Sequence, residues 1–362
     1  MNRLRVLYVP NEAGEFRQLG FRRPLANLLS TGLVEEVSIF SLQWRIREGG
    51  DPEGHRQDLL RRVRDFRPNM LLMQHLGSTG LTESHFSAMR AACDFEFVYH
   101  EADPFSRHLH PLPRAARAAG QSADVVFTVG NGVFAENFRR AGARDVRWAA
   151  SPFEPERFGI PVDSDPSTRT HDVVVVANKN RPRWRGLPNW RNRIAFVEHL
   201  QTRFGDRLAI YGRGWRGVGA MGPIDFSRQG DAIRSGWVSA NWDHFADEPM
   251  YFSNRLPISL AAGSIHATTR HPGYESLFEA ETNDFLIFGK TYEGLSSSIQ
   301  RMLDVTSPTQ RIAASIQAQR YAHREFRQDN QLVSFLNFQD VRVPPNVASQ
   351  SWDLTTAPLA EV

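Results

Sequence analysis

The stretch HDVVVVAN at residues 171–178 contains four consecutive valines, Val173 to Val176. A continuous β-branched run of this kind predicts a strand that is covered on both faces, as in a parallel sheet. The stretch before it, SPFEPERFGIPVDSDPSTRT at residues 151–170, is rich in Pro, Asp, Ser and Thr and has no hydrophobic periodicity. Such a composition is typical of a linker. Because strand and helix patterns alternate on both sides of this stretch, the sequence predicts two domains.

Apolar runs that predict strands recur along both halves, with amphipathic stretches between them. We expect strands at Leu4–Pro10, Val34–Leu42, Met70–Leu76, Phe95–His100, Val125–Gly130, Val146–Ala150, His171–Asn178, Leu208–Tyr211, Val238–Asn241, Ile265–Thr268 and Phe285–Phe288. Alternating strands and helices predict an α/β fold with parallel sheets and right-handed crossovers. The expected parts are a Rossmann-like domain (1–152), a linker (153–170), a second Rossmann-like domain (171–330) and a loose tail (331–362).

Composition excludes several classes of protein. The chain has 41% hydrophobic and 23% charged residues, as globular proteins do, and no run approaches the ~18 apolar residues of a membrane span. The N-terminus begins a strand pattern at once, so we expect no signal peptide. A single cysteine, Cys93, makes no disulfide framework and fits a reducing cytoplasm. A net charge of only +3 disfavours nucleic acid as a partner.

One surface leaves two interpretations open. Leu19, Phe21, Arg22 and Arg23 combine basic and apolar side chains. They fit either a peripheral contact with the inner face of a membrane or a helix that packs on the sheet.

In open α/β sheets ligands bind beyond the carboxyl ends of the strands, so the residues there are candidate site residues. Gly212-Arg213-Gly214-Trp215 follows a predicted strand, and glycine there allows a phosphate to approach the backbone. Lys179 and Arg181 follow the valine strand. In each case the alternative is an ordinary turn or a solvated basic loop.

A third candidate is Ser253-Asn254-Arg255, where Ser253 and Asn254 are favourable residues for a helix N-cap. The N-terminus of a helix attracts phosphate, and Arg255 would reinforce it. Capping alone accounts for Ser253 and Asn254 but not for the arginine.

The order of these motifs resembles the C-terminal domain of group 1 glycosyltransferases, in particular the CgeB-like (spore-maturation-protein-B-like) branch. The residues that carry the resemblance are Gly212-Arg213-Gly214-Trp215, Asn241, Arg255 with Ala261-Ala262-Gly263, and Thr269 to Phe278 with Pro272-Gly273 and Glu275. The resemblance implies a GT-B fold, in which two Rossmann-like domains face each other across a cleft. It also implies that 1–152 is the acceptor domain and that 171–330 binds a nucleoside-diphosphate sugar such as a UDP-sugar. It implies no permanently bound cofactor and no metal.

One residue departs from the pattern of these relatives. Ile258 stands where they usually have a glutamate that is expected to bind the ribose hydroxyls. This difference leaves open a catalytically degenerate module that binds nucleotide or sugar without turnover.

The densest set of titratable residues at a predicted strand end is His100-Glu101-Ala102-Asp103. Glycosyl transfer needs a base for the acceptor hydroxyl or a group that stabilises developing charge. His100, Glu101 and Asp103 are therefore the candidate catalytic residues, with His100 similar to the histidine that faces the sugar in group 1 transferases. The alternative is a capping Asp103 and a structural His100.

Residues at the same predicted edge are candidates for binding a small-molecule or glycan acceptor: Asn11, His75 and Asn131.

A dehydrogenase is disfavoured, because PNEAGEFRQLG follows the first strand instead of the dinucleotide-binding motif G-x-G-x-x-G. His108 and His110 have no third residue at a convincing spacing, so we expect no zinc site.

Overall fold

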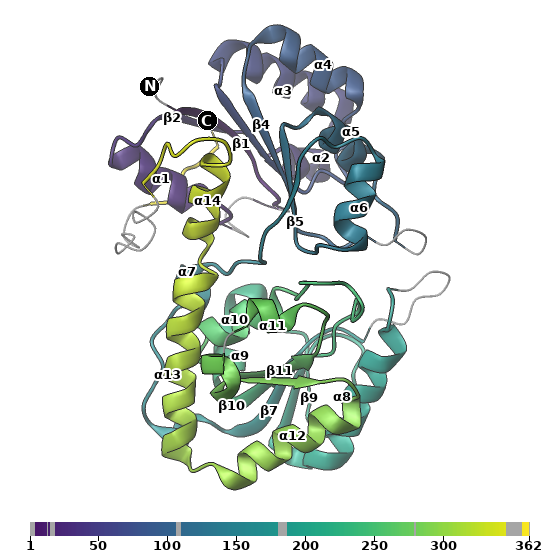
Figure 1. Ribbon diagram of the computed structural model, residues 1–362, viewed down its shortest axis with the longest axis vertical. Coiled ribbons are helices and arrows are strands. Elements are labelled where there is room, and N and C mark those ends of the chain that lie inside the picture. Colours follow the sequence, from purple (N-terminus) through teal and green to yellow (C-terminus); the bar gives the residue numbers. More distant parts are fainter. Residues whose placement is uncertain are drawn as a thin grey trace. The chain divides into compact units, whose positions relative to one another are not determined.

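The computed structural model describes residues 4–12, 14, 19–105, 110–179, 187–278, 280–344 and 357–361. The chain divides into two compact units. The first consists of Met1–Ala150 together with Gln328–Val362, and the second consists of Ser151–Arg327. Each unit is built on a six-stranded sheet (Figure 1).

The sheet of the first unit has the strand order β2-β1-β3-β4-β5-β6, and all its neighbouring strands are parallel. The strands are β1 (Leu4–Val9), β2 (Val34–Ile39), β3 (Met70–Gln74), β4 (Glu96–Glu101), β5 (Val125–Thr128) and β6 (Val146–Trp148). The helices are α1 (Arg22–Ser30), α2 (Leu42–Glu48), α3 (Pro52–Phe66), α4 (Glu83–Ala92), α5 (Arg114–Ser122), α6 (Val133–Arg140) and α14 (Gln328–Leu336). The chain reverses direction across the sheet between β1 and β3, and ligands bind near such a switch point.

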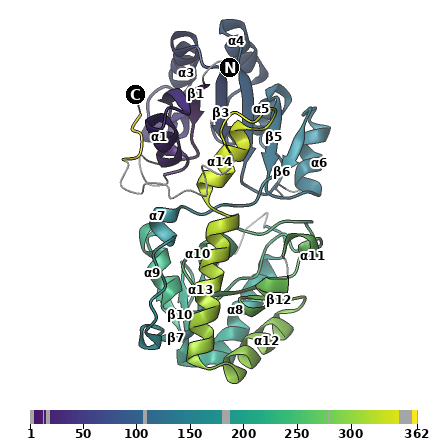
Figure 2. The ribbon, with the colours of Figure 1, turned by 60° about the vertical axis from the view of Figure 1, so that its left-hand side comes forward.

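Helices cover both faces of this sheet, because the strands are apolar on both sides. Leu59 of α3, Phe86 of α4 and Phe138 of α6 are buried in one hydrophobic cluster. Leu25 of α1 and Phe335 of α14 belong to a second cluster. α1 and α14 lie side by side (Figures 1 and 2).

Helix α14 corrects the predicted C-terminal tail. Phe335 is 1% exposed, and its ring stacks on Phe127 of β5 with the centroids 4.3 Å apart. Gln331 Nε2 donates to the carbonyl of Ala150 at 2.7 Å. Residues 328–344 are thus an integral part of the first unit, while 345–356 lie outside the described residues.

The sheet of the second unit has the order β12-β11-β10-β7-β8-β9, and its neighbouring strands are again parallel. The strands are β7 (His171–Val176), β8 (Leu208–Tyr211), β9 (Ala220–Gly222), β10 (Gly236–Ala240), β11 (Ile265–Thr269) and β12 (Leu286–Gly289). The helices are α7 (Pro155–Phe158), α8 (Trp190–Phe204), α9 (Gln229–Arg234), α10 (Arg255–Ala261), α11 (Tyr274–Leu277), α12 (Tyr292–Val305) and α13 (Pro308–Glu325). The valine strand β7 lies inside this sheet, which explains why Val173 and Val174 are fully buried. The three-residue strand β9 was not predicted.

The stretch expected as a linker is packed into the second unit instead. Phe153 and Phe158 are 2% and 1% exposed. The buried guanidinium of Arg169 donates to the carbonyls of Arg234, Gly236 and Gly263 at 2.6, 3.0 and 2.8 Å. The polar composition therefore reflects turns that cover the unit, and the chain passes between the units at residues 150–151 and 327–328.

One smaller expectation is corrected: the predicted strand Val34–Leu42 ends at Ile39, and Leu42 begins α2. Of the two interpretations of Leu19, Phe21, Arg22 and Arg23, the buried side chains favour the packed helix, because Phe21 and Arg22 are 0% exposed. Across the part of the chain that the structure describes, every helix is too short or too polar to cross a bilayer.

Candidate functional site

A hollow of about 470 Å³ opens at the carboxyl ends of β7, β8 and β10 in the second unit. Its lining comprises Val176, Ala177, Asn178, Tyr211, Gly212, Arg213, Pro223, Ile224, Phe226, Gln229, Ile233, Ser239, Ala240, Asn254, Arg255, Ile258 and Ser259. The predicted residues Gly212, Arg213, Asn254 and Arg255 therefore meet in one place. The sequence analysis did not predict the apolar part of the lining, which comes from Pro223, Ile224, Phe226 and Ile233. The only sequence feature that marks this segment is the Gly222-Pro223 pair, which is typical of a turn.

Gly212 allows two loops to pass close to each other at this hollow. Its φ is 152°, and a Cβ atom there would lie 2.0 Å from the carbonyl oxygen of Ala177. The loops are further joined by hydrogen bonds from Arg213 N to Asn178 Oδ1 at 2.8 Å and from Lys179 N to Arg213 O at 2.9 Å. Only glycine fits at position 212 without displacing the end of β7.

Two arginines give the lining of the hollow a positive charge. Arg255, at the start of α10, is half-buried, and its Nε donates to the carbonyl of Val176 at 2.9 Å. This bond fixes the guanidinium, while Arg213 lies on the exposed loop after β8. Among the described lining residues, these two arginines are the only charged side chains, and guanidinium groups suit phosphate oxygens.

Lys179 and Trp215 lie beside the hollow but do not line it. Lys179 Nζ forms an ion pair with Glu198 Oε1 at 2.6 Å and lies 5.1 Å from the centre of the Trp215 ring. Trp215 is 7% exposed, and its Nε1 donates to the carbonyl of Ala177 at 2.6 Å. The side chains of Lys179 and Trp215 therefore pack against the loop Gly212–Trp215 that follows β8. Gly214 has a φ of 88° in the turn of this loop.

Asn241 and Ser253 lie beneath the edge of the sheet, 3% and 8% exposed. Asn241 Nδ2 donates to Asp243 Oδ1 at 2.7 Å, and Asp243 Oδ2 pairs with His271 Nε2 at 3.0 Å. Burial raises the pKa of Asp243, but the hydrogen bond and charge of His271 outweigh it and hold that pKa well below its usual range. This buried pair joins the ends of β10 and β11, so Asn241 has a structural partner.

Three further predicted donor residues lie in different places. Asn254 lines the hollow at the N-cap position of α10, where its side chain makes no capping hydrogen bond. Glu275 lies in a separate hollow with Arg270 and Lys290, and its carboxylate is 3.9 Å from Arg270. Arg181 lies outside the described residues.

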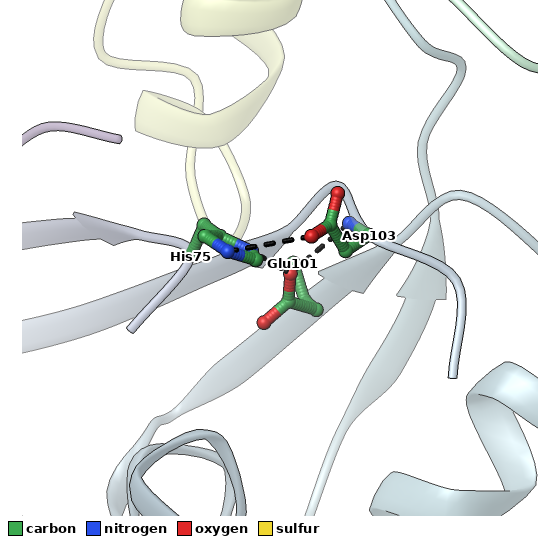
Figure 3. Close-up of side chains that lie close together, drawn as sticks. All are labelled: His75, Glu101 and Asp103. Carbon is green, nitrogen blue, oxygen red and sulfur yellow. Dashed lines mark hydrogen bonds and ion pairs between the residues drawn. The ribbon is translucent and has the colours of Figure 1, made fainter. Parts of the chain in front are cut away.

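In the first unit, the ends of β3 and β4 bring together His75, Glu101 and Asp103 (Figure 3). His75 Nδ1 is 2.7 Å from Glu101 Oε1, and its Nε2 is 3.3 Å from Asp103 Oδ2. Tyr99 donates its hydroxyl proton to Glu101 Oε2 at 2.5 Å. Glu101 is fully buried, whereas the Asp103 side chain is 53% exposed, so the cluster leads from the interior to the surface.

The charge of His75 follows from these contacts. Burial disfavours its imidazolium, but the hydrogen bond and charge of Glu101, together with Asp103, outweigh burial and raise the pKa of His75 to about 9. The residue also has a left-handed backbone, with a φ of 47°. Such a conformation costs on the order of 1–3 kcal/mol outside glycine and is often found at functional sites.

His100, the predicted catalytic histidine, has a different environment. It is 1% exposed, its ring lies 4.9 Å from that of Phe335, and Gln74 Nε2 is 2.9 Å from its Nδ1. Burial, with the nearby charge of His75, lowers the pKa of His100 to about 3. It is therefore a neutral residue of the interior, and His75, expected only as an acceptor-binding residue, pairs with the carboxylates instead.

The other predicted acceptor residues are also found at strand ends. Asn11 follows β1 and is half-buried, and Asn131 follows β5 and is exposed. β1 and β5 are separated by two strands in the sheet, so the three residues are spread along one edge of it. Glu12, which follows Asn11, forms a buried ion pair with Arg22, whose Nη2 is 2.6 Å from Glu12 Oε1.

A family model described as glycosyl transferase-like matches residues 191–337. This range includes most of the second unit and continues through α14. No curated protein sequence matches the chain.

Solved structures resemble the chain over most of its length. HepE from Anabaena, solved with UDP and glucose, has 15% identity and a TM-score of 0.55, covering 93% of this chain and 100% of its own. Sucrose-phosphate synthase from Thermosynechococcus elongatus has 13% identity and a TM-score of 0.56, covering 93% and 99%. The N-terminal domain of trehalose-6-phosphate phosphatase from Candida albicans has 8% identity and a TM-score of 0.60, covering 94% and 97%. At these identities the likeness is one of fold: the chain has the two-unit α/β fold of GT-B glycosyltransferases, as the sequence predicted.

Proposed function

We propose that the chain is a glycosyltransferase that moves a sugar from a nucleoside-diphosphate-sugar donor to a hydroxyl or similar nucleophile of an acceptor. The observation that carries this proposal is the hollow in which Arg213 and Arg255 lie beside the closely approaching backbone of Gly212. Two guanidinium groups suit a diphosphate. The match of residues 191–337 to a glycosyl transferase-like family supports the same function.

UDP-sugars are the first donors to test. The Anabaena protein HepE was solved with UDP and, separately, with UDP-glucose. We expect the donor to be a co-substrate, with no permanently bound cofactor and no metal ion.

For the chemistry we propose Asp103 as the general base, with His75 as the residue that positions it. The exposed carboxylate of Asp103 would accept the acceptor's hydroxyl proton while the acceptor oxygen bonds to the anomeric carbon and the diphosphate leaves. The His75 imidazolium, bonded to Glu101 at Nδ1, would hold the Asp103 carboxylate through its Nε2. The ligand atoms of His75, Glu101 and Asp103 lie within 4.8 Å of one another, so this cluster is where a metal ion would bind if the activity required one.

A second candidate function is a nucleotide-binding module without turnover. Ile258 favours it, because this apolar side chain lines the hollow at the position where the resemblance to group 1 glycosyltransferases implies a glutamate. The two functions share nucleotide binding and differ in sugar transfer. Release of nucleoside diphosphate from a nucleotide sugar, in the presence of candidate acceptors, separates them.

Isothermal titration with UDP, in buffer containing EDTA, tests the donor site. We expect Arg255→Ala to weaken binding at least tenfold, because it removes a fixed cation from the hollow. The matched control is Arg270→Ala, an exposed arginine of the other hollow, which should leave the affinity within about twofold. Equal affinities of wild type and Arg255→Ala, or a dependence on divalent metal, would contradict the proposal.

A further inference from the structure

The ring of His75 lies between two carboxylates (Figure 3). Its Nδ1 is 2.7 Å from Glu101 Oε1, and its Nε2 is 3.3 Å from Asp103 Oδ2. An ionised carboxylate only accepts hydrogen bonds, so Nδ1 must carry a hydrogen atom that it donates to Glu101. In the neutral ring Nε2 then has a lone pair and faces an oxygen of Asp103 that also has lone pairs. These two atoms need a positive charge between them.

Either a proton or a metal ion can supply this charge. With a proton, His75 is an imidazolium that donates to Asp103. With a metal ion, the two atoms are ligands, and ligand atoms at about 2.0–2.1 Å from a tetrahedral Zn²⁺ lie about 3.3 Å from each other. The separation of 3.3 Å between His75 Nε2 and Asp103 Oδ2 therefore fits a zinc ion without a movement of either side chain.

Glu101 takes the place of the outer carboxylate of a metal site. A histidine that binds a metal usually donates its other ring N–H to such a group, which fixes the tautomer and the orientation of the ring. Glu101 is itself held, because Tyr99 donates its hydroxyl proton to Oε2 at 2.5 Å and the backbone N of Asp103 donates to Oε1 at 3.0 Å. His75 therefore presents its Nε2 in one orientation.

The place beside His75 Nε2 is accessible from solvent. The side chains of Glu101, His75 and Asp103 are 0%, 19% and 53% exposed, so exposure increases from the outer carboxylate to the second ligand. An ion can enter from the surface and keep water at its remaining positions. One nitrogen and one oxygen ligand suit Zn²⁺, whereas Mg²⁺ prefers six oxygen ligands.

His85 forms a histidine–carboxylate pair that lacks this arrangement. Its Nε2 is also 3.3 Å from a carboxylate oxygen, Glu53 Oε1. Its Nδ1, however, accepts a hydrogen bond from the backbone N of Thr82 at 3.2 Å, so the hydrogen atom of the neutral ring is on Nε2. That hydrogen atom lies between the ring and Glu53, and Nε2 has no lone pair for a metal ion.

We propose that His75 and Asp103 form a zinc site, in which Zn²⁺ binds His75 Nε2 and Asp103 Oδ2 and Glu101 is the outer partner of the histidine. Binding displaces the proton between the two ligands, which is released to solvent. The ion occupies the carboxylate of the proposed general base and therefore inhibits sugar transfer. This inhibitory role rests on the proposed function, and transfer itself needs no metal ion.

Calorimetric titration of the full chain with ZnCl₂, in a buffer that does not chelate zinc, tests the site. We expect His75→Asn to weaken zinc binding at least tenfold, because loss of a ligand costs no less than loss of an outer partner. Asparagine tolerates the left-handed backbone at this position, where φ is 47°. Equal affinities of wild type and His75→Asn, or displacement of zinc by an equal concentration of Mg²⁺, would overturn the site.

The matched control is His85→Gln, which should leave the zinc affinity within about twofold, since glutamine keeps the capping interaction at this helix position. Asp103→Asn is a second ligand variant, at a half-exposed side chain where loss of folding is not expected. It should weaken zinc binding at least tenfold as well. An unchanged affinity in an Asp103→Asn protein that is folded by circular dichroism would also overturn the site.

Release of nucleoside diphosphate from a nucleotide sugar tests the inhibition. We expect saturating zinc to lower the rate at least tenfold and EDTA to restore it, because the bound ion removes the base. A rate that stays unchanged while zinc is bound would overturn the inhibitory role. If there is no release even in EDTA, the proposed function fails and the inhibitory role fails with it, while the zinc titration still decides the site.

Discussion

At the residue scale, the distinctive feature is the pairing of a histidine with a buried carboxylate at the end of β4. The motif His100-Glu101-Ala102-Asp103 correctly predicted that titratable groups gather at this strand end, and Glu101 and Asp103 do lie together. It could not predict which histidine they meet. Neighbouring residues of a strand point to opposite faces, so His100 and Glu101 cannot share one environment. The partner, His75, comes from the end of the adjacent strand β3, and such pairing depends on register.

The raised pKa of His75 gives a prediction with a definite sign. Its folded value of about 9 lies above the ordinary 6.5, so the charged pair stabilises the fold fully below pH 6.5. This stabilisation is lost as the pH rises from 6.5 through about 9. In Glu101→Gln the main source of the increase is removed, and we expect the pKa of His75 to fall toward or below 6.5.

Proton NMR titration of the His75 ring, in wild type and Glu101→Gln, measures this change. Glu136→Gln is a suitable control, because Glu136 pairs with Arg140 on the surface of α6. It should leave the His75 titration unchanged. A pKa of His75 near 6.5 in the wild type would contradict the predicted pairing.

At the scale of elements, the strands were the most predictable part of the chain and the C-terminal segment the least. Leu208–Tyr211 was predicted with its observed bounds, because a short β-branched or apolar run between turn residues has few alternatives. Gln328–Leu336 is a nine-residue helix whose apolar side chains are covered by the first unit. The sequence of this helix does not indicate that it packs on the sheet of the first unit. The last strand of that sheet ends at Trp148, and the whole second unit lies between Trp148 and the helix along the chain.

Helix α14 makes a stability prediction. Phe335 lies against Phe127, His100 and Phe21, with ring centroids 4.3, 4.9 and 5.8 Å away. We expect Phe335→Ala to lower the free energy of unfolding of the first unit by about 3–5 kcal/mol, since it removes a buried ring and leaves a cavity.

Urea denaturation followed by tryptophan fluorescence and circular dichroism measures this loss. Ser334→Ala, at the exposed neighbouring position, should change stability by no more than about 0.5 kcal/mol. Equal effects of the two substitutions would mean that α14 does not contribute to the core of the first unit.

At the scale of the whole molecule, the second unit is one continuous segment, whereas the first is made of two segments. The donor hollow lies wholly within residues 151–327. We expect a fragment of these residues to fold and to bind the nucleotide with an affinity within about tenfold of the full chain, because every lining residue is retained.

Calorimetric titration of the fragment checks this prediction. A fragment 151–327 that folds but binds no nucleotide would place part of the donor site elsewhere.

A companion protein tests the first unit. It joins residues 1–150 to 328–362 by a short Gly/Ser linker, which is geometrically feasible because Gln331 contacts Ala150. This protein should fold, whereas residues 1–150 alone should not reach the same stability.

The division of the first unit also sets the order of events on the ribosome. The sheet of that unit emerges early, but the helix that covers Phe127 is made only after the whole second unit. At 5–20 residues per second, about 180 intervening residues take on the order of 10–35 seconds to synthesise. During that interval we expect the aromatic face at Phe127 to stay uncovered, so the cluster that includes α14 closes only after the second unit has been made.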